Sequence, residues 1–321
     1  QVTMKKPYKQ LTLKQRYQIQ NLSEASFSNS YIADKVKCNK STIGREINRN
    51  KNSIYCAEEA HKLASKRRKT AAKASKFTQR AMDLILALMI KDLSPAAIAG
   101  RCELEGFDIV SHETIYRWIY NDKKRKGEAY KYLLRSYRGF RKTRKTQDGR
   151  GLLADRVSID QRGQSANDRS QKGHWEGDTV HGKKGSLVTL VDRKTRFLAV
   201  RKSETRTKNE VTKKINSMLK LHKAKTLTVD NGREFYGHQE VKRISNVKVF
   251  FADPYSSWQR GSNENANGLL RRYYPKGCDF STVTAQHLRR TVEKINLMPR
   301  KLLNWKSAYE VHYGVSVALI T

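Results

Sequence analysis

The feature that most constrains the fold is a change of pattern near Gly173. Before this residue, short amphipathic stretches alternate with polar turns. After it, runs rich in β-forming residues occur, separated by helical segments, at 186–191, 197–201, 226–229 and 247–251. Strands that alternate with helices indicate an α/β domain. We therefore expect a multidomain chain, with all-α helix-turn-helix units first and an α/β domain over residues 173–315.

The charge of the chain restricts its partners. Lys and Arg outnumber Asp and Glu by 66 to 30, so the formal net charge is +36. A polyanion is the natural partner, and nucleic acid fits best because each cation placed on a phosphate releases condensed counterions. The longest apolar-rich stretch, Ala81 to Ile90, is too short to cross a membrane. Since no secretion signal is evident at the N-terminus, we expect a cytoplasmic protein.

Residues 8–50 contain three short amphipathic stretches, at 13–22, 29–36 and 41–48. A polar turn separates the second from the third, and Ser41 or Thr42 can cap the helix that follows. This pattern predicts a helix-turn-helix domain, although an ordinary small helical bundle is an alternative. In a helix-turn-helix the helix after the turn enters the major groove, so five residues are candidates for DNA contact. They are Lys40, Thr42, Arg45, Asn48 and Arg49.

Residues 51–76 are typical of a basic helical linker, in which Arg67 and Arg68 could follow a phosphate backbone or form a solvated helix face. A second helix-turn-helix domain is predicted over residues 77–122, because Ser94-Pro95 and Ser111 both have the chemistry of helix starts. We expect Thr114 and Arg117 to contact DNA there, while the neighbouring Trp118 could instead close the core.

Residues 123–172 form a second predicted linker. From Lys123 to Lys145 there are eleven basic residues against one acid, and aromatic residues are interleaved with them. This combination suits a nucleic-acid track, with Arg141 and Lys142 as contacts, but solvated charge runs are also common.

Three acids in the α/β part occupy places where local structure holds a side chain. Asp178 lies in the first strand of a predicted hairpin, Asp230 ends an apolar run before Asn231-Gly232, and Glu264 follows a helix start. Strand ends are a common address for active-site acids. Carboxylates are also the hard oxygen ligands that two Mg²⁺ ions require. Glu176 shares a strand face with Asp178 and is an alternative ligand.

The flanks of these acids resemble a known family. Residues 173–180, 229–235 and 252–277 are similar to the catalytic signatures of insertion-sequence-thirty-type bacterial transposases. The longest piece runs from Trp258 to Gly277 around Glu264, and the interval from Asp230 to Glu264 is similar to that of the family. The resemblance extends over residues 8–315 and implies an RNase H-like, integrase-like catalytic domain.

The resemblance also implies roles for residues and partners. Asp178, Asp230 and Glu264 would be the catalytic metal ligands for two Mg²⁺ ions, for which Mn²⁺ substitutes. Asn267 and Arg271 would support the glutamate or contact DNA. The substrate would be double-stranded DNA, both the element's terminal inverted repeats and the target, handled by a homodimer or higher oligomer near the bacterial nucleoid.

Two aromatic residues lie near the predicted site, in a loop around Pro254. Exposed rings of Tyr255 and Trp258 could stack on an unpaired base, or they could anchor the core. Two other functions compete with transposition: a regulator that binds repeats without cutting, and a nuclease of the same fold acting on RNA–DNA hybrids. The presence of all three acids argues against the regulator. The N-terminal half, which is predicted to recognise a DNA sequence, argues against the nuclease.

Overall fold

The chain was analysed as a computed structural model, which describes residues 10–50, 54–70, 77–133, 155–254 and 256–318. It consists of two compact units, residues 1–75 and 76–321. The predicted contacts Arg141, Lys142 and Tyr255 lie outside the described residues.

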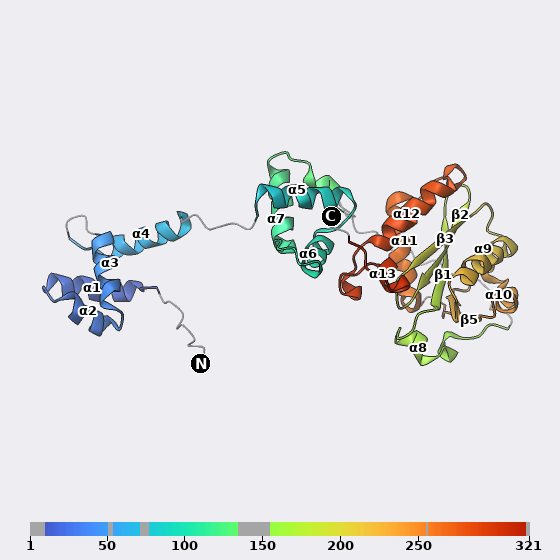
Figure 1. The fold of residues 1–321 in the computed structure, drawn as a ribbon, viewed down its shortest axis with the longest axis horizontal. Coiled ribbons are helices and arrows are strands. Elements are labelled where there is room, and N and C mark those ends of the chain that lie inside the picture. Colours follow the sequence, from blue (N-terminus) through green and yellow to red (C-terminus); the bar gives the residue numbers. More distant parts are fainter. Residues whose placement is uncertain (1–9, 51–53, 71–76, 134–154, 255, 319–321) are drawn as a thin grey trace. The chain divides into compact units, whose positions relative to one another are not determined.

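The first unit contains four helices, α1 (Leu13–Glu24), α2 (Asn29–Val36), α3 (Lys40–Arg49) and α4 (Ala57–Thr70) (Figure 1). Side chains cap the first three: Thr12 forms a capping box with Gln15, Ser28 caps α2, and Asn39 caps α3. Lys37 adopts the left-handed conformation between α2 and α3. The three predicted helices and the turn are therefore present.

Helix α4 differs from the expectation. Tyr55 and Ala60 are buried in the same apolar cluster as Ile19, Ile32 and Ile43 of the first three helices. The burial of its first turn explains why α4 is fixed although its last turn is strongly basic. Residues 57–70 are thus helical, as the prediction of a basic helical linker over residues 51–76 implied, but this helix packs on the first unit.

The second unit begins with three helices and a 3-10 turn, α5 (Gln79–Ile90), α6 (Pro95–Leu104), α7 (His112–Lys124) and η1 (Ala129–Tyr132). The predicted helix starts are correct, because Ser94 accepts a hydrogen bond from Ala97 N and Ser111 accepts one from Thr114 N. Ala129 is buried with the three helices in one core. This helical part therefore extends past residue 122, into the region expected to be a linker.

The α/β domain is built on a five-stranded sheet (Figure 1). Its strands are β1 (His174–His181), β2 (Ser186–Asp192), β3 (Leu198–Ser203), β4 (Thr226–Val229) and β5 (Lys248–Phe251). Their order is β3-β2-β1-β4-β5. The first three strands are antiparallel, whereas β4 is parallel to β1 and β5 is parallel to β4. This mixed sheet agrees with the predicted RNase H-like class.

Helices cover both faces of the sheet. On one face, α9 (Lys208–Leu221) and α10 (His238–Ser245) bury residues such as Ile215 and Val241 against Leu190. On the other, α11 (Gly261–Tyr273) and α12 (Ala285–Leu297) bury Leu270 and Ile295. The shorter helices are α8 (Gln164–Asn167) and α13 (Ala308–Tyr313), and the 3-10 turns are η2 (Ile159–Gln161), η3 (Arg233–Phe235), η4 (Ser257–Arg260), η5 (Phe280–Thr282) and η6 (Lys301–Leu303).

The segment before β1 also belongs to this domain. Ile159 and Ala166 are buried, and Phe251 N donates a 2.9 Å hydrogen bond to Val157 O. Residues 155–172 therefore pack on the sheet, although we expected them to be linker. The α/β domain therefore begins before Gly173.

Buried polar contacts join the helical part of the second unit to the C-terminal segment. The guanidinium of Arg101 in α6 makes two 2.9 Å hydrogen bonds to the carboxylate of Glu310 in α13. Asp92, just after α5, accepts a 2.8 Å bond from the hydroxyl of Tyr273 in α11.

Among the described residues no helix is long and apolar enough to cross a membrane.

Candidate active site

Asp178 lies in the middle of β1, opposite Thr189 of β2. One carboxylate oxygen accepts a 2.8 Å bond from Thr179 N, and the other accepts a 2.7 Å bond from the amide of Asn267 in α11. Burial raises the pKa of Asp178, and the negative charge of Asp230 raises it further against the opposing charge of Arg260. The carboxylate is therefore held in one orientation by a helix and a strand.

Asp230 follows the last residue of β4, as predicted. Its Oδ1 accepts a 2.9 Å bond from Gly232 N, and Asn231 donates a 2.8 Å bond to Ala252 O. These bonds close the turn at the strand exit. Because β4 pairs directly with β1, the sheet brings Asp230 beside Asp178.

Arg260 connects the two aspartates. Its guanidinium lies 3.1 Å from Asp230 Oδ2 and 3.6 Å from Asp178 Oδ1, and it also donates to Gly177 O at 3.2 Å. The side chain of Arg260 is only 12% exposed, whereas those of Asp178 and Asp230 are 25% and 37% exposed, so the ion pairs are partly shielded from solvent. Arg260 lies within the signature from Trp258 to Gly277, but the sequence pattern alone does not indicate this role for it.

Glu264 lies in the first turn of α11 and is exposed. In the described part of the chain, no three acidic, histidine or cysteine side chains are grouped closely enough to hold a metal ion. The structure thus brings together two of the three predicted acids. Glu264 is one helical turn from Asn267, which does contact Asp178.

Glu176 is committed to another task and is a poor candidate for a metal ligand. It is fully buried and forms an ion pair with Arg193. Its second oxygen accepts bonds of 3.0 and 3.1 Å from the backbone nitrogens of Ser262 and Asn263. Helix α11 has no capping side chain of its own. Glu176 therefore caps the helix that carries Glu264.

Glu234 is an acid beside the site that we missed. It accepts a 2.8 Å bond from the hydroxyl of Thr179 and lies 3.4 Å from Arg206. Burial would raise the pKa of Glu234, but its own backbone N–H, the Thr179 hydroxyl and Arg206 bring that pKa below its usual value. Glu234 lies in the segment 229–235, which resembles a catalytic signature of the family, and this position could have indicated a place near Asp230.

A helix-turn-helix domain model matches residues 7–50. The chain is 39% identical to the transposase for insertion sequence element IS4351 of Bacteroides fragilis, over 94% of this chain and 95% of that protein. It is 34% identical to the transposase for IS1086 of Cupriavidus metallidurans, over 95% of this chain and 94% of that protein. It is 35% identical to transposase InsI for IS30C of Escherichia coli, over 94% and 82%.

The chain belongs to the IS30 family of insertion-sequence transposases. It is therefore an enzyme that modifies nucleic acid, and its helix-turn-helix domain binds DNA. Among solved structures, the chain is similar to the catalytic core domain of BIV integrase, at 17% identity over 45% of this chain and 95% of that one, with a TM-score of 0.37.

The first unit of the transposase presents the predicted DNA contacts on α3. Lys40, Arg45, Asn48 and Arg49 are exposed, and Thr42 is half-buried. Arg45 folds back to its own helix, donating 3.0 Å bonds to Ser41. Arg67 donates a 2.8 Å bond to Asn50, and Arg68 is exposed. A groove of about 270 Å³ lies between α3 and α4 and is lined in part by Thr42, Arg45, Arg49, Arg67 and Arg68.

The remaining predicted contacts lie in the second unit. Arg117 is exposed on α7, whereas Thr114 bonds to the cap Ser111. Trp118 packs edge-on against Phe77, which supports the core alternative for that residue. Trp258 is 72% exposed, so it does not anchor the core.

Two further residues of α11 make contacts within the site region. Asn267 bonds to Asp178, as described above. Arg271 donates a 2.7 Å bond to His181 O at the end of β1 and a 3.4 Å bond to Pro275 O. Both residues therefore fix α11 to the strand that carries Asp178.

Proposed function

We propose that this transposase binds the terminal inverted repeats of its element and cuts and joins DNA strands at Asp178, Asp230 and Glu264 with two divalent metal ions. Mg²⁺ is the proposed physiological ion, and Mn²⁺ would substitute. The observation that carries the proposal is the proximity of Asp178 and Asp230 on adjacent strands, with the partly buried guanidinium of Arg260 between them. Asp178, Asp230 and Glu264 also lie in the three segments of this chain that resemble the catalytic signatures of the family, which supports the same assignment.

The donor set fits such ions. Carboxylate oxygens are the ligands that Mg²⁺ prefers, and the two aspartates already share one cationic group, the guanidinium of Arg260. When bound, the metal pair would supply activation of the attacking oxygen and stabilisation of the leaving oxygen. Arg260 would release its ion pairs at that stage, because guanidinium and metal compete for the same oxygens.

The chain's other residues would hold the geometry. Asn267 fixes the orientation of Asp178 through its 2.7 Å bond, and Glu176 holds the first turn of α11, where Glu264 lies. A small advance of this turn would present Glu264 to the aspartates. Positioning of this kind is the main contribution of a protein to an in-line phosphoryl transfer.

We propose that the helix-turn-helix domain recognises the repeats through α3, with Lys40, Arg45, Asn48 and Arg49 toward DNA. Thr114 and Arg117 of α7, together with Arg141 and Lys142, would add contacts to the flanking duplex. Trp258 would stack on a base near the cut, and Tyr255 is proposed to assist it. Because two element ends must meet, the active form would be a dimer or larger.

The test is incubation of the full-length protein with Mg²⁺ and labelled duplexes that end in the element's inverted repeats. We expect nicks at the repeat ends and joined products, which Asp230→Asn and Glu264→Gln abolish while repeat binding is retained. Glu240→Gln is the matched control, since Glu240 is exposed on α10 outside the site. Repeat binding by the wild type without nicking would favour a regulator, and cleavage of RNA–DNA hybrids alone would favour a nuclease.

A further inference from the structure

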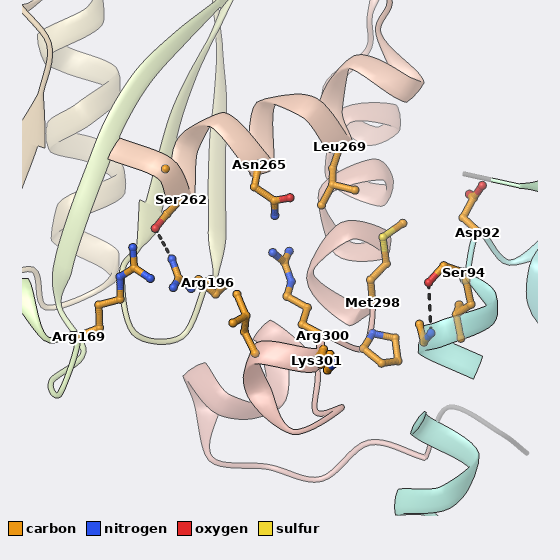
Figure 2. A pocket seen from close by; sticks show the side chains of 15 residues that line it. Asp92, Ser94, Arg169, Arg196, Ser262, Asn265, Leu269, Met298, Arg300 and Lys301 are labelled. Carbon is orange, nitrogen blue, oxygen red and sulfur yellow. Dashed lines mark hydrogen bonds between the residues drawn. The ribbon is translucent and has the colours of Figure 1, made fainter. Parts of the chain in front are cut away.

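A cavity of about 410 Å³ is lined by Ser262, Asn265 and Leu269 of α11 (Figure 2). Asn267, which bonds to Asp178, is two positions from both Asn265 and Leu269 and therefore projects from another side of the helix. The walls of the cavity come from α5–α6, from the segments before β1 and after β2, from α11, and from the chain after α12. The cavity therefore exists only because the helical part of the second unit packs against the α/β domain. Its volume is within the range of small-molecule sites.

Three arginines converge on this cavity from separate segments. Arg169 precedes β1, Arg196 lies between β2 and β3, and Arg300 follows α12. Figure 2 shows Arg169 and Arg196 close together and the guanidinium of Arg300 pointing toward Asn265 of α11. Lys301 adds a fourth cation to the lining.

The three arginines form no ion pair with an acid that the structure describes. Arg196 donates to the hydroxyl of Ser262, and Arg300 donates to Ile295 O at 3.3 Å. The Nε of Arg300 is buried and has no hydrogen-bond partner among the described residues. Arg300 therefore keeps one N–H donor that the described residues do not satisfy.

The nearby carboxylates are already occupied. Glu176 pairs with Arg193 and caps α11, and Asp192 accepts bonds from Gly173 N and Thr195 N. Asp92, which lines the far wall, lies 3.4 Å from Arg272 and accepts the Tyr273 hydroxyl. The cavity thus has an excess of positive charge.

Mutual repulsion of the cations is evident in their proton affinities. Burial lowers the pKa of Arg196 to about 10, and the charge of Arg169 contributes. Burial lowers the pKa of Arg300 to about 10 as well, with a contribution from Arg196. Like charges gathered in a partly buried cavity are destabilising unless an anion offsets them.

The rest of the lining suits a nucleotide. Leu269 of α11 and Met298 after α12 form an apolar wall opposite the arginines, and Leu302 is 80% exposed. A sugar or base can lie against such a surface while its phosphate meets the guanidinium groups, whose planar donors match phosphate oxygens.

We infer that this cavity binds a phosphodiester of the DNA strand that passes over the active site. The inference rests on the proposed function, because the cavity and the aspartates lie on two sides of one helix. A helix with its side chains is about 10 Å across, which a DNA strand spans in roughly three nucleotides at about 3.4 Å each. The arginines would therefore hold the strand a few nucleotides from the cut.

The experiment measures repeat-DNA binding by the full-length protein over a range of salt concentrations without divalent metal. Arg169→Gln and Arg300→Gln should each reduce the slope of log K against log salt, and the two changes together should reduce it by about 0.9, the value for one phosphate contact on duplex DNA. Arg300→Lys should keep most of the slope. Arg243→Gln, an exposed charge on α10, is the control for net charge and should leave it unchanged.

A second variant keeps the test independent of folding defects. Asn265→Asp places a carboxylate opposite Arg300, so it should raise the melting temperature while weakening DNA binding. Unchanged slopes in both arginine variants, or Asn265→Asp with unaltered affinity, would overturn the inference. A third outcome would also overturn the inference: inorganic phosphate stabilises the wild type but not the Arg300→Gln variant, while the salt slopes for DNA stay unchanged. The cavity would then bind a free anion and not a DNA phosphate. Since no step needs cleavage, a failure here is distinguishable from loss of nicking in the Mg²⁺ assay.

Discussion

Replacing Glu176 by Gln tests how helix α11, which carries Glu264, is held. The Glu176 carboxylate is fully buried, pairs with Arg193, and accepts the backbone N–H groups of Ser262 and Asn263 and the Ser262 hydroxyl. Gln has nearly the same shape but no charge, and it presents an NH₂ group to donors. The substitution therefore leaves Arg193 buried without this counter-charge and weakens the cap that Glu176 provides to α11.

The expected cost follows from these contacts. Breaking a buried ion pair by removing one partner costs about 3 to 5 kcal/mol. Up to about 2 kcal/mol of this cost comes from the loss of a negative charge at the N-terminus of α11. For a unit of this size each kcal/mol lowers the melting temperature by about 2 to 4 °C. We therefore expect a decrease of about 6 to 20 °C.

The assays are thermal unfolding followed by circular dichroism, and nicking and repeat binding at a temperature well below the transition. Because Glu264 lies in the turn that Glu176 caps, nicking should fall far more than binding. Glu210→Gln is the matched control: Glu210 also accepts two backbone N–H groups, from Glu204 and Thr205, but at the start of α9. A melting temperature within 2 °C of wild type (roughly 0.5 to 1 kcal/mol), or equal loss of nicking in both variants, would refute the reasoning.

Two other predictions concern charge. Arg260→Gln removes the cation that is paired with Asp178 and Asp230, and one hydrogen bond to a charged group is worth about 1.5 kcal/mol. The Mg²⁺ concentration for half-maximal thermal stabilisation should therefore fall about tenfold. An unchanged midpoint concentration would count against competition between Arg260 and the metal. Burial opposes ionisation of Glu310, but bonds from Arg101 and from the backbone of Ser307 and Val317 lower its pKa to about 2. The stability that this shift provides is fully present above the ordinary pKa of 4.5 and is lost as the pH falls toward 2, so Glu310→Gln should flatten the loss of urea resistance between about pH 5 and pH 3. Acid sensitivity equal to that of Glu240→Gln would contradict this assignment.

The local parts of the fold could be predicted because their causes are local. Ser28, Asn39, Ser94 and Ser111 cap helices within three residues of themselves, and the turn at Lys37 follows from the polar residues around it. The positions of Asp178 in a strand and of Asp230 at a strand end could likewise be predicted from the sequence. Each depends on a short apolar run and on the residues that end or reverse it.

Packing decided several features that looked like linker. The basic composition of residues 51–76 obscured the few apolar residues, Tyr55, Ala57 and Ala60, that fix α4 to the first unit. Residues 155–172 look equally polar, yet Ile159 and Ala166 are buried. Composition averages over a segment, whereas one or two side chains are enough to fix it once a partner surface exists.

The sequence by itself determined the class of each domain, the helix-turn-helix, the family, and the candidate acids. Only the tertiary structure decided which acids meet and what neutralises them. Arg260 reaches Asp178 and Asp230 because β1 and β4 are neighbours in the sheet, and Glu176 caps α11 because that helix starts beside β1. Such pairings join residues far apart in the chain, so no local pattern encodes them, and the arginine cavity on another side of α11 arises for the same reason.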